Sequence, residues 1–234
     1  MEGRAYMFIY VDESGSFVPA TRSDSWCVVA GYVVPEVVRK HVERSLSLLK
    51  RRVGCAYQNE LKLRHLSESQ LGRFLGELGD LESTLFISAI DLGHQDPQVV
   101  FAHQRKQVDS IRANRPNMLY EEGRASIDDL SGRLERLSPQ LYTQMVAQVD
   151  LLDQVFRMAT LYYAQRLPAT LGSFKWRMDE KNSARPLFEQ TLTHMAPALI
   201  QAKSLREPGI SVEGFDHSHF DKCFRMARRP PNFE

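Results

Sequence analysis

The segment 6–11, YMFIYV, constrains the fold of this chain more than any other stretch. It is a continuous run of apolar, aromatic and β-branched residues, which is typical of a strand buried on both faces in the middle of a sheet. The run ends at DESG, where Ser14 and Gly15 have the chemistry of a turn. A buried strand needs a covering layer on the sheet, so this segment favours an α/β fold.

Three later runs are also predicted to be strands, and much of the remaining chain is predicted to be helical. The strands span 26–34, 84–90 and 173–178, and the helices span 36–53, 67–78, 138–167 and 185–204. Ser67 and Ser138 are the expected N-caps of two helices. Gly31 is expected to mark a β-bulge, and 56–63 is expected to be extended. This order of elements predicts one sheet covered by helices.

The stretch 96–137 differs from the rest of the chain because it is polar, rich in Arg, Asn and Glu, and only loosely periodic. We expect it to be a helical insertion that lies over the functional site. The whole chain, including this insertion, fits a single domain spanning 1–234, since 234 residues with 43% hydrophobic content can bury a substantial core.

Charge and cysteine content exclude several classes of protein. The net charge is +1, which argues against tight non-specific binding of DNA through many phosphate contacts. The three cysteines are widely separated and no apolar run reaches the length of a membrane span, so we expect a cytoplasmic protein without a membrane partner. The sequence also lacks a Walker A loop, GxGxxG, GxSxG and HExxH.

Acids follow three of the predicted strands at the point where the chain leaves the sheet. They are Asp12, Asp91 and Asp179, and Glu60 lies in the short segment NELK between the first two. Carboxylates gathered at one sheet edge bind hard divalent cations such as Mg²⁺ or Mn²⁺. For Asp91 alone, the role of an ordinary turn residue is favoured. Asp12 follows six apolar residues directly, where an unpaired charge is costly.

These motifs together resemble a known family. VDESGSF after an apolar strand, AGYVV in the next strand, NELK, and MDEKN after a long helix occur in an order similar to the domain-of-unknown-function 3800 family. Members of that family look like ribonuclease-H-like proteins. The resemblance covers about 6–182, with the central insertion poorly matched. It implies a ribonuclease-H-like mixed sheet flanked by helices.

The resemblance also implies a metal site. Asp12, Glu60 and Asp179 would hold Mg²⁺ or Mn²⁺, with Asp12 as the central ligand. Lys62 would share a strand face with Glu60 and lie near a scissile phosphate. The equally weighted alternative is a solvent-exposed lysine that pairs with a nearby acid.

Further residues are implied to complete the site. Those expected to contact substrate are Ser14, Gly15 and Lys181. The family's usual closing helix, G-L-Q-x-A-D, is absent, and EGFDHSHFDKCF stands in its place. Asp216 or Asp221 would then supply the last metal ligand, with His219 as another ligand or a proton donor.

The function expected from these residues is metal-dependent hydrolysis of nucleic-acid phosphodiester bonds. The alternative is a catalytically degenerate protein that binds nucleic acid or a partner protein without cleavage, which the altered carboxy-terminal stretch favours. A third interpretation is a phage-defence or mobile-element effector that acts with a partner chain. RNA or DNA as substrate and a homo-oligomeric state are left open.

Overall fold

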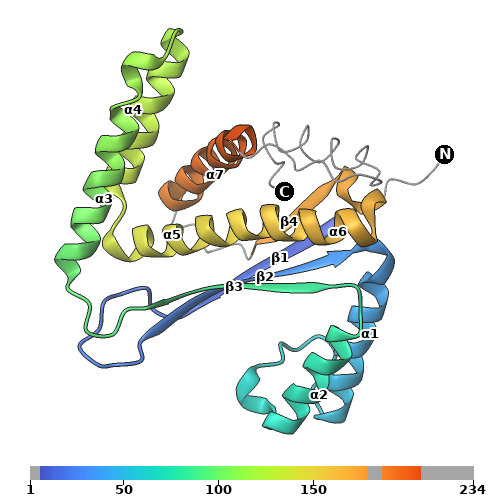
Figure 1. Cartoon of the computed structure of the whole chain (residues 1–234). Helices are drawn as coiled ribbons and strands as arrows, with labels where there is room; N and C mark the ends of the chain where they lie inside the picture. Colours follow the sequence, from blue (N-terminus) through green and yellow to red (C-terminus); the bar gives the residue numbers. More distant parts are fainter. Residues whose placement is uncertain (1–5, 179–185, 207–234) are drawn as a thin grey trace.

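A mixed four-stranded sheet forms the centre of the protein. The structure is a computed structural model that describes residues 6–178 and 186–206. The strands are β1 (Met7–Ser14), β2 (Trp26–Pro35), β3 (Thr84–Asp91) and β4 (Phe174–Met178). Their order is β3-β2-β1-β4, in which β1–β2 and β2–β3 are antiparallel and β1–β4 is parallel. The predicted mixed α/β sheet flanked by helices is therefore confirmed (Figure 1).

One face of this sheet carries most of the buried side chains. Met7, Ile9 and Val11 alternate along β1 and join a core formed with the long helix that follows residue 138. This helix consists of α5 (Pro139–Gln154), a π-helical segment (Val155–Ala159) and α6 (Thr160–Arg166). Its predicted course is confirmed, and the π-helical segment is an irregularity that the periodicity did not indicate.

The expected bulge at Gly31 is wrong. Gly31 pairs with Val11 on one side and Phe86 on the other, within unbroken antiparallel registers. A β-carbon on Gly31 would lie 3.2 Å from the side chain of Leu151 and 3.3 Å from that of Val155. The glycine is therefore explained by the close approach of α5 to the sheet, and not by a bulge.

The polar stretch 96–137 forms an antiparallel pair of helices, α3 (Pro97–Arg112) and α4 (Glu121–Arg136). Val108 and Leu134 belong to the same core as α5, and the Gln104 side chain donates to the carbonyls of Leu134 and Leu137. The pair packs on the α5 side of the sheet and projects away from it (Figure 1). It does not lie over the face that carries Asp12, so that expectation is wrong.

The remaining long helix, α7 (Pro186–Arg206), packs against α4 and α5 on the same side. Its buried side chains include Phe188, Leu192 and Ala196. Among the residues that the structure describes, no helix is long and apolar enough to cross a membrane.

The opposite side of the sheet is covered at one end by α1 (Glu36–Arg52) and α2 (Glu68–Gly79) (Figure 1). Ser67 caps α2 through a capping box with Gln70, and Ser138 caps α5, so both predicted N-caps are confirmed. The connection 53–67 contains a short 3₁₀ turn and no strand, so the predicted extended segment at 56–63 is wrong.

The prediction that β1 is buried on both faces is also wrong. Its outer face carries Phe8, which is 6% exposed beneath the guanidinium of Arg39, and then Tyr10, which is 38% exposed. On the neighbouring strands this face carries Leu85 and Ile87, each 51% exposed. We call the outer sheet surface formed by Tyr10, Asp12, Ser14, Trp26, Val28, Ala30, Tyr32, Leu85, Ile87, Ala89 and Arg177 the open face.

The packing of α5 on the sheet generates a stability prediction. Leu151 is fully buried and contacts Gly31, so Leu151→Ala should lower the free energy of unfolding by about 2–5 kcal/mol. Leu75 on α2 is 48% exposed, and Leu75→Ala should cost much less. Urea unfolding at constant m-value measures both, and equal losses would contradict the assignment of the core.

Buried tyrosines generate a second prediction. Burial raises the pKa of Tyr142, whose hydroxyl lies 2.7 Å from Nδ1 of His103, to about 12. An unfolded tyrosine titrates near pH 10. Because the folded pKa is higher, the stabilising contribution is complete below about pH 10 and is lost as the pH approaches about 12. Urea unfolding across this range should show the decline.

Tyr142→Phe is the matched variant for this measurement, because it keeps the ring and cannot ionise. Burial also raises the pKa of Tyr32 and Tyr163, so the variant should retain a smaller decline. If the free energy of unfolding of Tyr142→Phe declined with pH as steeply as that of the wild type, Tyr142 would not be a source of the decline.

Candidate functional site

Asp12 lies on the open face, near the carboxyl end of the central strand β1. Successive side chains of a strand point to opposite faces, so Tyr10, Asp12 and Ser14 share the open face while Val11 points to α5. The Asp12 side chain is exposed, and its Oδ1 accepts a hydrogen bond from the backbone N–H of Glu13 at 2.9 Å. Asp12 and Ser14, two residues of the predicted site, are thus brought to one surface.

Two rows of side chains cross the open face beside each other. In the first row Arg177 of β4, Tyr10 of β1, Tyr32 of β2 and Leu85 of β3 are register partners. The second row contains Asp12, Ala30 and Ile87. The carboxylate of Asp12 is therefore next to an aromatic row that ends in a cation.

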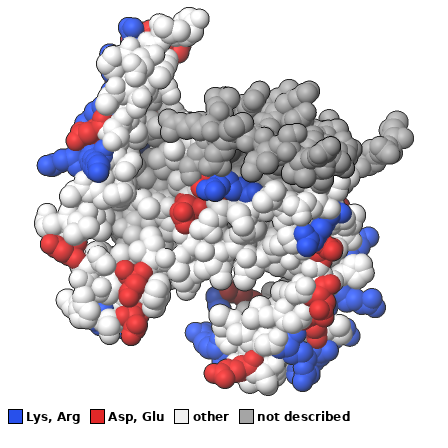
Figure 2. Space-filling model, in the orientation of Figure 1, with Lys and Arg blue, Asp and Glu red and all other residues white. Residues whose placement is uncertain are grey.

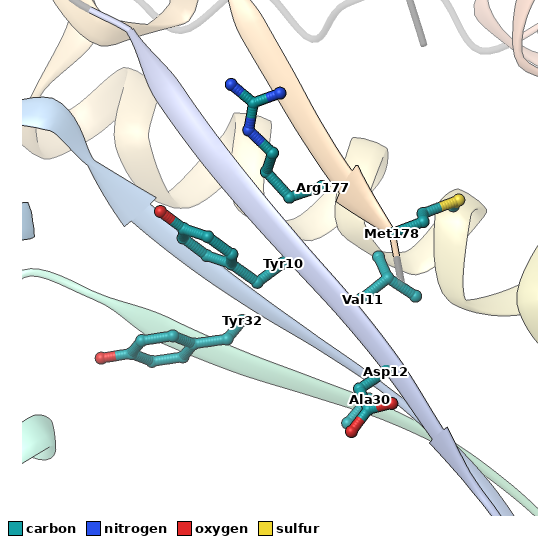
Figure 3. A pocket seen from close by; sticks show the side chains of 7 residues that line it. All are labelled: Tyr10, Val11, Asp12, Ala30, Tyr32, Arg177 and Met178. Carbon is teal, nitrogen blue, oxygen red and sulfur yellow. The ribbon is translucent and has the colours of Figure 1, made fainter. Parts of the chain in front are cut away.

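A hollow of about 340 Å³ lies over these rows. Its lining residues are Tyr10, Val11, Asp12, Ala30, Tyr32, Arg177 and Met178. Figure 3 shows the rings of Tyr10 and Tyr32 pointing in the same direction, away from Asp12, with the guanidinium of Arg177 also directed away from the acid. The Tyr32 hydroxyl lies 2.8 Å from Oγ of Ser83, which fixes one end of the aromatic row.

The parallel pairing of β1 and β4 bears on the second predicted acid. Met178, the last residue of β4, is the register partner of Val11, the residue before Asp12. Both strands run in the same direction, so their carboxyl ends meet at one edge of the sheet. Asp179 follows Met178 in the sequence and lies outside the described residues.

Glu60 and Lys62 lie together in the connection between α1 and α2, and both are exposed. Lys62 Nζ forms an ion pair with Glu60 Oε1. The observed contact is the alternative that the sequence left open, a solvent-exposed lysine paired to a nearby acid. The connection lies on the same side of the sheet as Asp12 (Figure 1).

Asp91 has a structural role at the end of β3. Its Oδ1 accepts hydrogen bonds from the backbone N–H groups of Ser25 at 3.1 Å and Gly93 at 2.8 Å. These bonds tie the segment that enters β2 to the turn that leaves β3. Asp91 therefore satisfies two backbone donors, as the turn interpretation predicted.

Gly15, predicted to contact substrate, is required by the packing of the turn after β1. Its φ is +111°, and a β-carbon would lie 2.8 Å from both Cα and Sγ of Cys27. The backbone N–H of Phe17 donates to the same sulfur at 3.1 Å. The glycine of DESG thus lets the turn fold back onto β2 beside the buried Cys27.

The described residues do not complete a metal site. Within 6–178 and 186–206, no group of three or more His, Cys, Asp or Glu side chains is placed to hold a metal ion. Asp12 supplies one carboxylate, and Glu60 is engaged with Lys62. The other predicted site residues, Asp179, Lys181, Asp216, His219 and Asp221, lie outside the described residues.

The aromatic residues of the open face were missed by the sequence analysis. Tyr10 was placed in a strand predicted to be buried on both faces, and Trp26 and Tyr32 were given no role beyond that of strand residues. Period-two spacing along β1 and β2 was the available signal, because Tyr10 and Asp12 must share a face. Tyr163 and Trp176, in contrast, lie in the core and are fully or almost fully buried.

Comparison with known proteins gives no match. The chain matches no protein-family model, no curated protein and no solved structure. The resemblance to the domain-of-unknown-function 3800 family stays a prediction based on the motifs.

The turn after β1 generates a testable prediction. Gly15→Ala should lower the free energy of unfolding by about 1–3 kcal/mol or more, because it places a side chain at positive φ and against the backbone of Cys27. Gly76→Ala is the matched control, since nothing lies within 4 Å of its added carbon and alanine favours the helix. Chemical denaturation of both variants measures the difference, and a neutral Gly15→Ala would contradict the packing at Cys27.

Proposed function

We propose that the protein is a nuclease of the ribonuclease-H-like kind that hydrolyses nucleic-acid phosphodiester bonds with Mg²⁺ or Mn²⁺, with Asp12 as its central acidic residue. The single observation that carries this proposal is the position of Asp12. Asp12 is an exposed carboxylate near the carboxyl end of the central strand β1. The neighbouring strand β4 is parallel to β1, and Asp179 follows its last residue in the sequence.

The sheet supports the fold part of the proposal. Three strands that are successive in the sequence pair antiparallel, and β4 returns to pair parallel with β1. Such a mixed sheet, with helices packed on it, is what the motif order implied. Ligand sites in open α/β sheets lie at the carboxyl ends of parallel strands, and Asp12 is near such an end.

The surroundings of Asp12 support its role as a site residue. The hollow over Tyr10, Tyr32 and Arg177 leaves space for a ligand next to the carboxylate. The only side-chain hydrogen bond of Asp12 among the described residues is with the next backbone N–H, so within 6–178 and 186–206 it ties no distant segment to β1. This contrasts with Asp91, which ties two segments together.

The metal requires further ligands. Asp12 would hold the ion together with Glu60 and Asp179, as the motif order implies, and Asp216 or Asp221 would close the site in place of the missing family ending. When bound, a divalent ion would supply charge stabilisation for phosphodiester hydrolysis. Of the groups that would form this site, the described residues supply the Asp12 carboxylate on β1 and the Arg177 guanidinium, both of which line the hollow.

A second candidate function is nucleic-acid or protein binding without cleavage. The observation that favours it is the altered carboxy-terminal stretch EGFDHSHFDKCF, which stands where the family's closing acidic helix is expected. The two candidates differ in whether a metal is needed, so one set of experiments separates them.

Asp12→Asn provides the test. Wild-type protein should cleave RNA or DNA only with added Mg²⁺ or Mn²⁺, and Asp12→Asn should lower the rate by more than about 100-fold, since even residues behind the ligands of metal sites contribute 10- to 100-fold. Mn²⁺ should also raise the melting temperature of wild type, because an ion that binds the folded state stabilises it, and Asp12→Asn should lose this shift.

Asp80→Asn is the matched control, because Asp80 is an exposed acid at the end of α2. It should keep wild-type cleavage and the full Mn²⁺ shift. Equal activity of the wild type and Asp12→Asn would exclude Asp12 from the site. Nucleic-acid binding without cleavage in any metal would select the second candidate.

A further inference from the structure

The open face presents exposed aromatic rings on both sides of Asp12. Tyr10 and Tyr32 form the neighbouring row, and Trp26, four residues before Ala30 on the same face of β2, lies on the other side. At the usual rise along a strand, the row of Asp12 is about 7 Å from that of Tyr10 and about 13 Å from Trp26. Trp26 is 56% exposed and Tyr10 is 38% exposed.

The aromatic residues of this face are only partly used by the fold. The ring of Tyr10 stacks on that of Phe8 with centroids 6.3 Å apart, and Tyr32 is held through Ser83, yet the described residues leave Tyr10 38% and Trp26 56% exposed. Exposed aromatic and aliphatic side chains gathered on one surface indicate an interaction site. Aromatic rings on an open sheet are the usual platform on which unpaired bases stack.

Cations border the same surface. Arg177 ends the row of Tyr10, and Lys175 lies two residues earlier on β4, with its ammonium 4.1 Å from the ring centre of Tyr6. The last turn of α1 carries Lys50, Arg51 and Arg52. Figure 2 shows Lys and Arg interspersed with Asp and Glu over α1 and α2, the helices that border the open face, and a recess between these helices and the opposite end of the sheet. In α1, Arg52 pairs with Glu77 and Lys50 donates to the carbonyls of Tyr57 and Asn59. Complementarity to a phosphate backbone is therefore assigned to Lys175 and Arg177 on β4, at the edge of the aromatic surface.

The number of cations on the open face and the exposed area of its aromatic rings indicate whether it would bind a single-stranded or a double-stranded nucleic acid. A duplex hides its bases and is held through many phosphate contacts, whereas the open face has few cations and includes an acid. A single strand offers unpaired bases, each of which can stack on an exposed aromatic ring whatever its sequence. The surface therefore fits an unpaired strand better than a duplex.

We propose that the open face binds single-stranded nucleic acid, with bases stacked on Tyr10 and Tyr32 on one side of Asp12 and on Trp26 on the other. Arg177 and Lys175 contact the phosphates. This inference rests on the proposed nuclease function and names its substrate class, an unpaired strand whose backbone passes over Asp12. Binding itself needs no metal.

Tryptophan fluorescence gives a direct test on the full chain. The protein has two tryptophans, Trp26 exposed and Trp176 only 1% exposed. A single-stranded oligonucleotide of about 12 nucleotides, in buffer with chelator, should quench the emission of Trp26 on binding. In Trp26→Phe the emission comes from the buried Trp176, so the quenching should disappear while binding persists through the phenyl ring. Unchanged quenching in this variant would overturn the inference.

Affinity measurements test the other rings. With a labelled single strand, Tyr10→Leu and Trp26→Leu should each weaken binding by about five-fold or more, the effect of losing one base stack. Tyr10→Phe should bind as wild type, because it keeps the ring. Tyr120→Leu is the matched control, since Tyr120 is 74% exposed at the start of α4, on the other side of the sheet. The same sequence as a duplex should bind at least about ten-fold more weakly.

The outcomes separate this inference from the proposed function. Metal-dependent cleavage with affinity and KM unchanged in Tyr10→Leu and Trp26→Leu would overturn the stacking surface and leave the nuclease intact. Stacking-dependent binding with no cleavage would retain the surface and overturn the nuclease. Tighter binding of the duplex than of the single strand would overturn the inference. It would also be overturned if the protein bound no nucleic acid and formed a dimer that the substitution Ile87→Lys separates, because the open face would then be a dimer interface.

Discussion

The burial of one sheet face against α5 is the interaction on which the rest of the structure depends. Met7, Ile9 and Val11 interlock with the inner side of this helix, and Gly31 allows the helix to approach the backbone. The helices α3, α4 and α7 then pack on the same side. Among the residues that the structure describes, the opposite face is covered only at the end where α1 and α2 lie (Figure 1).

This asymmetry fixes the position of the site. Side chains alternate along β1, so burying Val11 against α5 forces Asp12 and Tyr10 onto the opposite face. A slip of one residue would place the carboxylate in the core and Val11 in solvent, which the desolvation of an unpaired acid forbids. The hydrophobic core thus sets the register, and the register brings the acid and the aromatic rows together.

The sequence was a good guide to the elements and a poor guide to their layers. Helix periodicity and capping residues such as Ser67 and Ser138 act locally, so the helices could be predicted. Whether β1 is covered on its second face depends on where distant helices pack, and no local pattern contains that information. The apolar run therefore suggested two buried faces, although Tyr10 remains partly exposed. The same limit explains the wrong placement of the polar insertion.

The candidate site shows a similar division. The strand-end position of Asp12 could be predicted because a buried strand and the acid after it are adjacent in the sequence. Glu60 could not be placed, because its segment has no regular structure and its charge is satisfied by Lys62 two residues away. Asp91 and Asp12 look alike in the sequence, yet Asp91 accepts from two separate backbone segments while Asp12 accepts from its own neighbour.

This difference in partners gives a physical criterion for separating the two acids. A carboxylate that binds the backbone of distant segments stabilises the fold, and its position is explained without a ligand. The hydrogen bond of Asp12 joins it only to the next residue among those described, so this carboxylate adds little to the stability of the fold. It is exposed on the open face, beside the row of Tyr10 and Tyr32. Its location is then explained by what approaches the face from outside. For Asp12, the rings of Tyr10 and Trp26 and the cation of Arg177 are the features that support our proposal of an unpaired nucleic-acid strand as this ligand.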